Sequence, residues 1–133
     1  MTASQRALSA YGNAQSASKS ASQIEYQAFA KVTNRMTKNH SDDPIERALK
    51  FADLAAAMHD NLKLWTIVAG DVAQENNGLP EKLRAQLFYL AEFTRVHTQR
   101  VLKGETGPAP LIDINTSIMR GLRQQSEAEA CPA

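Results

Sequence analysis

The sequence of 133 residues contains a single cysteine, Cys131, which lies third from the end in a polar segment. The chain therefore cannot form an internal disulfide or a thiolate metal cluster, and this cysteine content is typical of the reducing cytoplasm. The opening residues lack the apolar run of a secretory signal, and no apolar stretch reaches the ~18 to 20 residues that span a bilayer. We therefore expect a cytoplasmic protein with no membrane insertion.

An excess of charge of one sign is also missing, because 15 Lys and Arg residues nearly balance 14 Asp and Glu residues. The overall charge thus gives no reason to expect nucleic acid, an anionic membrane or a strongly acidic substrate as the main partner. No segment alternates apolar and polar residues between hairpin turns, so no strands are expected. A chain of this length buries one core, which predicts a single all-helical domain.

The first part of the chain is expected to hold an arm and a helix. Residues 1–21 have only Leu8 and Tyr11 as large apolar side chains, which predicts a flexible N-terminal arm. The segment Ser-Gln-Ile-Glu that begins at Ser22 has the pattern of a capping box, so a first helix is expected from there to about Lys38. Its apolar residues recur at helical spacing and predict one buried face, formed by Ile24, Ala28, Phe29, Val32 and Met36.

The second helix is expected to follow Asp43, an N-cap candidate with Pro44 in the first helical position and Glu46 completing a capping box. From there to about Glu75 the only helix-breaking residue is Gly70, so either one helix of ~30 residues or two helices broken near the middle fit the sequence. Two apolar rows predict a helix sandwiched between neighbours. One row consists of Ile45, Ala48, Ala52, Ala55, Met58, Leu62, Trp65, Ala69 and Val72, and the other of Leu54, Ala57, Leu64, Ile67 and Val68.

Two more helices complete the predicted fold. Gly78 is expected to be a left-handed C-terminal cap of the second helix, and Pro80 is expected to open a third. The third helix is expected to end near Lys103 and to carry a main stripe of Leu83, Leu87, Leu90, Thr94, His97 and Val101. A short fourth helix is expected over 110–122, with Asp113 as its N-cap or first-turn anion. The predicted architecture is a small antiparallel bundle of three main helices plus this short C-terminal helix, a domain of residues 22–122 followed by a disordered tail at 123–133.

The residues that catalysis or metal binding requires are not grouped in the sequence. His40, His59 and His97 lack the i, i+4 spacing of a helical metal pair, so structural or solvent-exposed roles are favoured. Asp71 and Glu75 lie one turn apart at a helix end and are more simply a solvated face than a catalytic pair. We therefore expect no enzymatic activity, no metal site and no cofactor.

Two further features have a structural and a functional interpretation. Basic residues of the third helix lie near Tyr89 and Phe93, an arrangement in which aromatic rings can stack on unpaired bases. Cations spread over a solvated face are the favoured interpretation, so no direct nucleic-acid binding is expected. The basic residues concerned are Lys82, Arg84, Arg95, Arg100 and Lys103.

Asn61 lies on the second apolar row, where an amide is most often a hydrogen-bonded core group that fixes register and less often a partner contact.

A family resemblance rests on six segments in matching order and spacing. They are AYGNAQ (10–15), EYQAFAKVT (25–33), LKLW (62–65), LPEKLRAQL (79–87), KGE (103–105) and PLIDINTSIMRGL (110–122). On these segments, the chain resembles over residues 9–122 the FlaF family of bacterial flagellar biosynthesis proteins. The segment DDPIERALKFADLAAAMHD is richer in alanine than expected of the family, and the arginine that usually precedes the Glu-Tyr pair is missing.

The resemblance implies a protein that binds newly made flagellin, covers the apolar stripes of its terminal helices, and supports type III export and flagellum assembly. The alternative that it implies is post-transcriptional control of flagellin synthesis through a second flagellar regulatory protein. Several apolar residues are candidates for partner contacts, although those of the fourth helix have a role in the core as their alternative. The candidates are Trp65, Tyr89, Phe93, Val96, Leu111, Ile112, Ile114, Ile118 and Met119.

Overall fold

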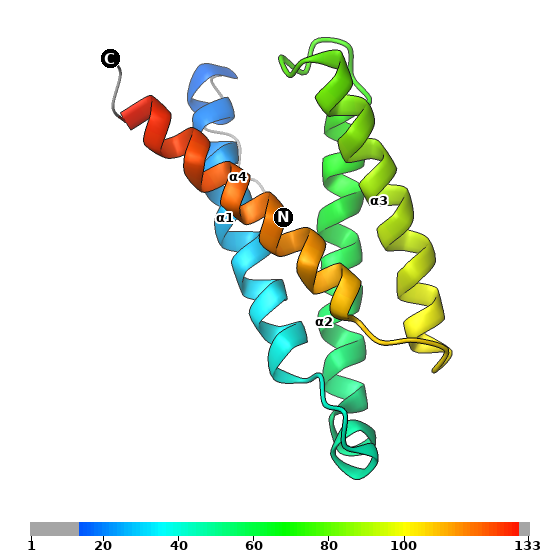
Figure 1. The fold of residues 1–133 in the computed structure, drawn as a ribbon. Coiled ribbons are helices and arrows are strands. Elements are labelled where there is room, and N and C mark those ends of the chain that lie inside the picture. Colours follow the sequence, from blue (N-terminus) through cyan, green and yellow to red (C-terminus); the bar gives the residue numbers. More distant parts are fainter. Residues whose placement is uncertain (1–13, 131–133) are drawn as a thin grey trace.

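The computed structural model describes residues 14–130, with side chains over residues 26–124. Four helices make up the fold: α1 (Ala14–Lys38), α2 (Pro44–Val72), α3 (Glu81–Leu102) and α4 (Ala109–Ala130). Figure 1 shows α2 running antiparallel to α1 and α3, with α4 lying obliquely along α1. The described part of the chain contains no strand, which confirms the predicted all-α bundle. None of its helices is long and apolar enough to cross a bilayer.

The first helix begins earlier than the sequence predicted. Because α1 already includes Ala14, Ser22 and Glu25 lie inside the helix and the predicted start at Ser22 is wrong. Residues 14–21 consist of Ala, Gln, Lys and Ser without Gly or Pro, so nothing in them interrupts a helix that extends from the packed part of α1. The remainder of the predicted arm, residues 1–13, lies outside the described residues.

The second helix is continuous over 29 residues, which decides between the two alternatives left open by the sequence. Asp43 caps it as predicted, because its carboxylate accepts a hydrogen bond of 2.9 Å from the Glu46 backbone N–H. Pro44 occupies the first turn, where its missing N–H costs nothing. The reciprocal half of the capping box is replaced by another bond, since the Asp43 N–H donates to Ser41 Oγ at 3.2 Å.

The cap gives a first testable prediction. Asp43→Ala is expected to lower the free energy of unfolding by about 1 kcal/mol, because a backbone N–H in the first turn of α2 loses its acceptor. Urea denaturation measures this change. Asp42→Ala is the matched control, since it removes the same charge from a fully exposed neighbouring side chain. Equal losses in the two variants would show that charge near the helix end, and not the cap, is responsible.

The first three turns of α2 are exposed, and the predicted sandwich applies only to the rest of the helix. Ile45, Ala48 and Ala52 begin the predicted first row but lie on solvent, whereas Met58 and later members are buried or half-buried. Figure 1 shows the beginning of α2 extending past the end of α1, so no neighbouring helix covers it. Ile67, on the predicted second row, is also exposed.

Two glycines adopt the left-handed conformation. The helix α2 ends at Val72 with Ala73 as its C-cap, so the prediction of Gly78 as the cap of that helix is wrong. Gly78 (φ 93°) follows α2 and Gly104 (φ 78°) follows α3, positions where a side chain would be strained. Pro80 stands directly before α3 as predicted. Leu83, at the start of the predicted main stripe, is exposed near this end of the bundle. The later residues of the stripe are buried as predicted, at Thr94, His97 and Val101.

The fourth helix begins before and ends after the predicted range of 110–122. Its start is set by the buried Pro108, whose carbonyl accepts a hydrogen bond of 2.9 Å from the Leu111 N–H. Asp113 therefore lies inside the helix, and its assignment as an N-cap or first-turn anion is wrong. The helix continues into residues predicted to form the tail, because residues 123–130 contain no Gly or Pro.

Two apolar clusters form the core, and a polar layer separates them. The first consists of Met36, Leu54, Ala57, Met58, Val101 and Leu111. The second consists of Phe29, Trp65, Val68, Val72 and Ala91. Each helix places a buried polar residue between its contributions to the two clusters: Thr33 in α1, Asn61 in α2, Thr94 in α3 and Asn115 in α4. Such a layer favours one register of the helices, because a shifted register would separate the hydrogen-bonding groups.

Candidate functional site

A hydrogen-bond network in the polar layer joins α1, α2 and α4. The Trp65 indole N–H donates to Asn115 Oδ1 at 2.9 Å. Because an indole N–H can only donate, this bond fixes the orientation of the Asn115 amide. Its Nδ2 group then donates to Asn61 Oδ1 at 2.7 Å and to Thr33 Oγ1 at 3.1 Å. The network confirms the interpretation of Asn61 as a hydrogen-bonded core group.

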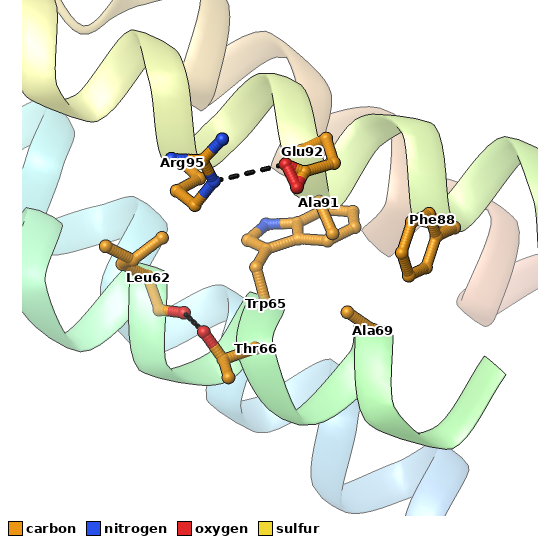
Figure 2. Close-up of a pocket in the computed structure, with 8 residues that line it drawn as sticks. All are labelled: Leu62, Trp65, Thr66, Ala69, Phe88, Ala91, Glu92 and Arg95. Carbon is orange, nitrogen blue, oxygen red and sulfur yellow. Dashed lines mark hydrogen bonds and ion pairs between the residues drawn. The ribbon is translucent and has the colours of Figure 1, made fainter. Parts of the chain in front are cut away.

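Trp65 also forms the floor of a groove between α2 and α3. Phe29 of α1 meets its ring edge-on, with ring centroids 5.4 Å apart and an interplanar angle of 73°. On the side of α3 the indole lines a cavity of about 250 Å³ (Figure 2). The floor is thus held from behind by α1 and α4. The other residues that line this α2–α3 groove are Leu62, Thr66 and Ala69 of α2, with Phe88, Ala91, Glu92 and Arg95 of α3.

The groove has an apolar floor and a polar rim. Figure 2 shows Trp65 between the two helices, with Phe88 toward one end and Leu62 toward the other. On the α3 edge, Arg95 Nε pairs with Glu92 Oε2 at 3.1 Å. The cavity is smaller than the ~300–1,000 Å³ that small-molecule sites occupy. It therefore fits one or two apolar side chains of a protein partner better than a cofactor or a metabolite.

Helical spacing extends the apolar line beyond the cavity. On α3, Phe88, Arg95 and Leu102 are seven residues apart and share one side of the helix. On α2, Phe51 precedes Leu62 by three turns and lies on the same side. Because the two helices are antiparallel, Phe51 and Leu102 lie at the same end, and both are exposed. At 1.5 Å per residue, the part of α2 from Phe51 to Ala69, which lines the far end of the cavity, spans about 27 Å.

The predicted partner-contact residues on α3 are divided by the structure. Tyr89, with 67% of its surface exposed, and Val96 lie on the outer side of α3, facing solvent. Phe93 is half-buried, and its ring stacks on His97 with centroids 5.3 Å apart. The α3 residue that faces the groove next to Tyr89 is Phe88, which is 47% exposed.

The predicted partner-contact residues on α4 pack on the core of the protein itself. Leu111 is fully buried in the first cluster, and Ile112 packs against that cluster. Ile114, Ile118 and Met119 are half-buried and pack against the second cluster. This placement supports the alternative that they are core residues. A partner contact through them stays a prediction, and it would require α4 to move.

Several groove residues were not expected from the sequence. Trp65 was a candidate, and Leu62 was assigned only to an interior row. Phe88 was missed because it lies one position outside the main stripe of α3. The available signal was the seven-residue repeat of Phe88, Arg95 and Leu102, which marks a second side of α3 beside the stripe.

The histidines and the other potential ligands do not converge among the described residues. His97 is structural, as predicted, because it is buried and its Nε2–H donates to the Gly107 carbonyl oxygen at 2.9 Å. His40 is half-buried beside Asp42, at 4.0 Å. His59 is exposed on α2. In the part of the chain that the structure describes, no three His, Cys, Asp or Glu side chains gather as a metal site.

Two carboxyl groups in the second half of α2 have shifted pKa values. The Arg35 guanidinium of α1 donates to Asp60 Oδ2 at 2.7 Å and lowers the pKa of that carboxyl. The stability that the Asp60–Arg35 pair contributes is therefore present above the ordinary Asp pKa of about 3.9, and it is lost as the pH falls through the lowered pKa of Asp60. Burial raises the pKa of Asp71, so the pKa of this carboxyl is shifted in the opposite direction from that of Asp60. The first shift comes from a bond that ties α1 to α2, and the second from burial at the end of α2.

The basic residues of α3 are mostly engaged within the chain. Arg84 Nη1 donates to the Gln74 carbonyl oxygen at 3.0 Å, beyond the end of α2. Arg95 forms the ion pair on the groove rim, and Arg100 Nε pairs with Glu105 at 3.4 Å. A phosphate-binding surface would need such cations to be available. The pairing supports the interpretation of a solvated, internally paired face.

The fold and the groove together define a small all-helical bundle protein with an apolar groove between α2 and α3. The chain belongs to the FlaF family: the family described as flagellar protein FlaF matches residues 7–122. No curated protein and no solved structure gives a match. Two segments on which the resemblance rested, LKLW and PLIDINTSIMRGL, meet in the fold through the bond between Trp65 and Asn115.

Proposed function

We propose that this chain is a non-catalytic cytoplasmic chaperone that binds newly made flagellin in the α2–α3 groove and holds it for export. Membership in the FlaF family supplies the flagellar context. Flagellin ends in amphipathic helices that bundle in the filament, so their apolar stripes need a cover before export. A reversible cover requires an apolar surface of matching length on the chaperone.

The groove is the observation that carries this proposal. An amphipathic helix laid along it would place anchors spaced three, four and seven residues apart over the line from Phe51 and Leu102 to Phe88. The cavity over Trp65 would take the central anchor, and the polar edge of the client helix would lie beside the ion pair of Arg95. An apolar centre with a polar rim is the usual anatomy of a protein interface.

The rigid floor of the groove favours binding energetically. A standard interface covers about 800 Å² on each partner, and most of the affinity comes from a few central, well-packed anchors. Trp65 is already fixed by its bond to Asn115 and by the edge contact with Phe29. Ordering the floor on binding therefore costs little, so more of the burial energy remains as affinity.

Co-purification with full-length flagellin and with flagellin truncated at either end tests the proposal. The expected result is a stoichiometric complex that survives moderate salt, because apolar burial depends little on ionic strength, and that is lost when one terminal helix is removed. Binding that falls steeply with salt and follows RNA would contradict it. If deletion in cells abolishes flagellin translation while supplied flagellin is exported normally, regulation of synthesis replaces the chaperone role.

A further inference from the structure

The exposed beginning of α2 carries a second apolar surface, separate from the groove. Ile45 is 73% exposed and Leu49 is 79% exposed, the highest values among the large exposed apolar side chains of the described residues. Ala52 and Ala56 continue the same side of the helix at spacings of three and four, and both are exposed. We call these four residues the α2 outer face. A soluble protein rarely leaves such a face without a partner.

The outer face lies on a different side of α2 from the groove. Leu54, on the side opposite to it, is buried in the first cluster. Phe51 and Leu62, which line the groove side of α2, lie a third of a turn or more away around the helix from Leu49 and Ala56. A helix in the groove and a second helix on the outer face can therefore contact α2 at the same time.

Acidic groups outnumber basic groups beside the outer face. Residues 42–53 contain four acidic and two basic side chains, in a chain whose net charge is +1. Asp53 makes no hydrogen bond or ion pair with the side chains that the structure describes. Glu46 lies two turns before it on the same edge and pairs with Lys50 Nζ at 3.5 Å. A hydrogen bond with Ser41 and the Lys50 ammonium lower the pKa of Glu46, so this carboxyl stays ionised.

The two basic residues of this segment are turned toward the chain itself. Arg47 donates to the carbonyl oxygens of Ser41 and Asp42, each at 3.1 Å. Lys50 Nζ donates to the Lys38 carbonyl oxygen at 3.2 Å, at the end of α1. Both therefore fasten the loop between α1 and α2. Lys50 also pairs with Glu46, so Asp53 is the carboxylate on this edge that remains available to a partner.

This charge pattern disfavours a second copy of the chain as the occupant. Two outer faces that met antiparallel about a twofold axis would bring the same edge of each helix together. The segments 42–53 of the two copies, each with more acidic than basic side chains, would then lie against each other, and like charges across such a contact are destabilising. An occupant with basic residues along its apolar stripe has the complementary pattern.

We propose that the α2 outer face binds an amphipathic helix of a second protein, one whose apolar stripe is bordered by Lys or Arg residues, of which one pairs with Asp53. Ile45 and Leu49 supply the large anchors, and Ala52 and Ala56 let the partner helix approach closely. The contact is independent of the groove, so the chain joins two proteins at once. This inference does not rest on flagellin as the occupant of the groove.

Two synthetic helical peptides with one shared Leu/Ala stripe, bordered by Lys in one and by Glu in the other, test the proposal. Their affinity for the full chain is measured by fluorescence anisotropy. The Lys peptide is expected to bind at least tenfold more tightly, and Asp53→Asn is expected to reduce that preference severalfold. Leu49→Ser is expected to weaken the Lys peptide about tenfold. Ile67→Ser is the matched control, since Ile67 is 62% exposed on the same helix but outside the outer face.

Each contrary result removes the proposal in a different way. Equal binding of the two peptides would show that charge does not select the partner helix. An unchanged affinity in Leu49→Ser would show that the outer face does not bind the peptide. A dimer in light scattering that Leu49→Ser converts to a monomer would assign the face to a second copy. If Leu49→Ser weakens flagellin binding as strongly as a groove variant does, the outer face and the groove form one flagellin-binding surface.

Discussion

Asn115→Ala is expected to lower the free energy of unfolding by about 2 to 4 kcal/mol, as measured by urea denaturation. The loss arises because one substitution removes the partner of three buried groups, namely the Trp65 indole N–H, Asn61 Oδ1 and Thr33 Oγ1. Each buried polar group left unpaired costs about 1 to 3 kcal/mol, and partial relaxation reduces their sum. The effect is large for a domain whose total stability is about 5 to 15 kcal/mol.

Ser117→Ala provides the control on the same helix. Ser117 is exposed two residues further along α4, and alanine is the better helix former, so this variant is expected to stay within about 0.5 kcal/mol of the parent or to gain slightly. If both substitutions cost little, the polar layer does not hold α4 in place. If both cost the same large amount, α4 is sensitive to any change and the hydrogen bonds are not the reason.

Phe88→Ala is expected to weaken flagellin binding by about 2 kcal/mol, roughly 30-fold in Kd. Phe88 borders the cavity over Trp65 and is the largest apolar side chain of the groove that stays accessible to a partner. Truncation removes apolar contact at the groove while leaving the buried clusters intact. Titration calorimetry with monomeric flagellin measures the change, and circular dichroism checks that the variant is folded.

Tyr89→Ala is the matched comparison, because Tyr89 is the next residue and is more exposed but lies on the outer side of α3. It is expected to change the affinity less than threefold. The pair separates the groove from the alternative partner surface formed by Tyr89 and Val96. A large loss in Tyr89→Ala with little change in Phe88→Ala would place the client on that outer side.

Much of the fold could be predicted because its signals are local. The cap at Asp43, the left-handed conformation of Gly78 and the later part of the α3 stripe depend on neighbouring residues, and the structure confirms them. The starts of α1 and α4 were wrong for a related reason. Ser22 and Asp113 fit capping patterns, but such a pattern cannot show whether the preceding residues also continue the helix.

The candidate site was harder to predict, because it depends on which sides of two helices meet. Trp65 is part of an apolar row in the sequence, and only the antiparallel packing of α2 on α3 makes its ring the floor of a groove. The exposure of Ile45 likewise depends on where α1 ends in space. The partners of Asn115 are 50 to 82 residues away in the chain, beyond the reach of any periodic pattern.

The most direct test of flagellin binding in the α2–α3 groove is site-specific photo-crosslinking. A photoreactive amino acid at Thr66, which lies exposed in the groove, is compared with the same group at Tyr89, and mass spectrometry identifies the linked flagellin peptides. We predict crosslinks from position 66 to a terminal helix of flagellin and none from position 89. Crosslinks from position 89 alone, or none from either position in a complex that still co-purifies, would contradict the assignment of the groove.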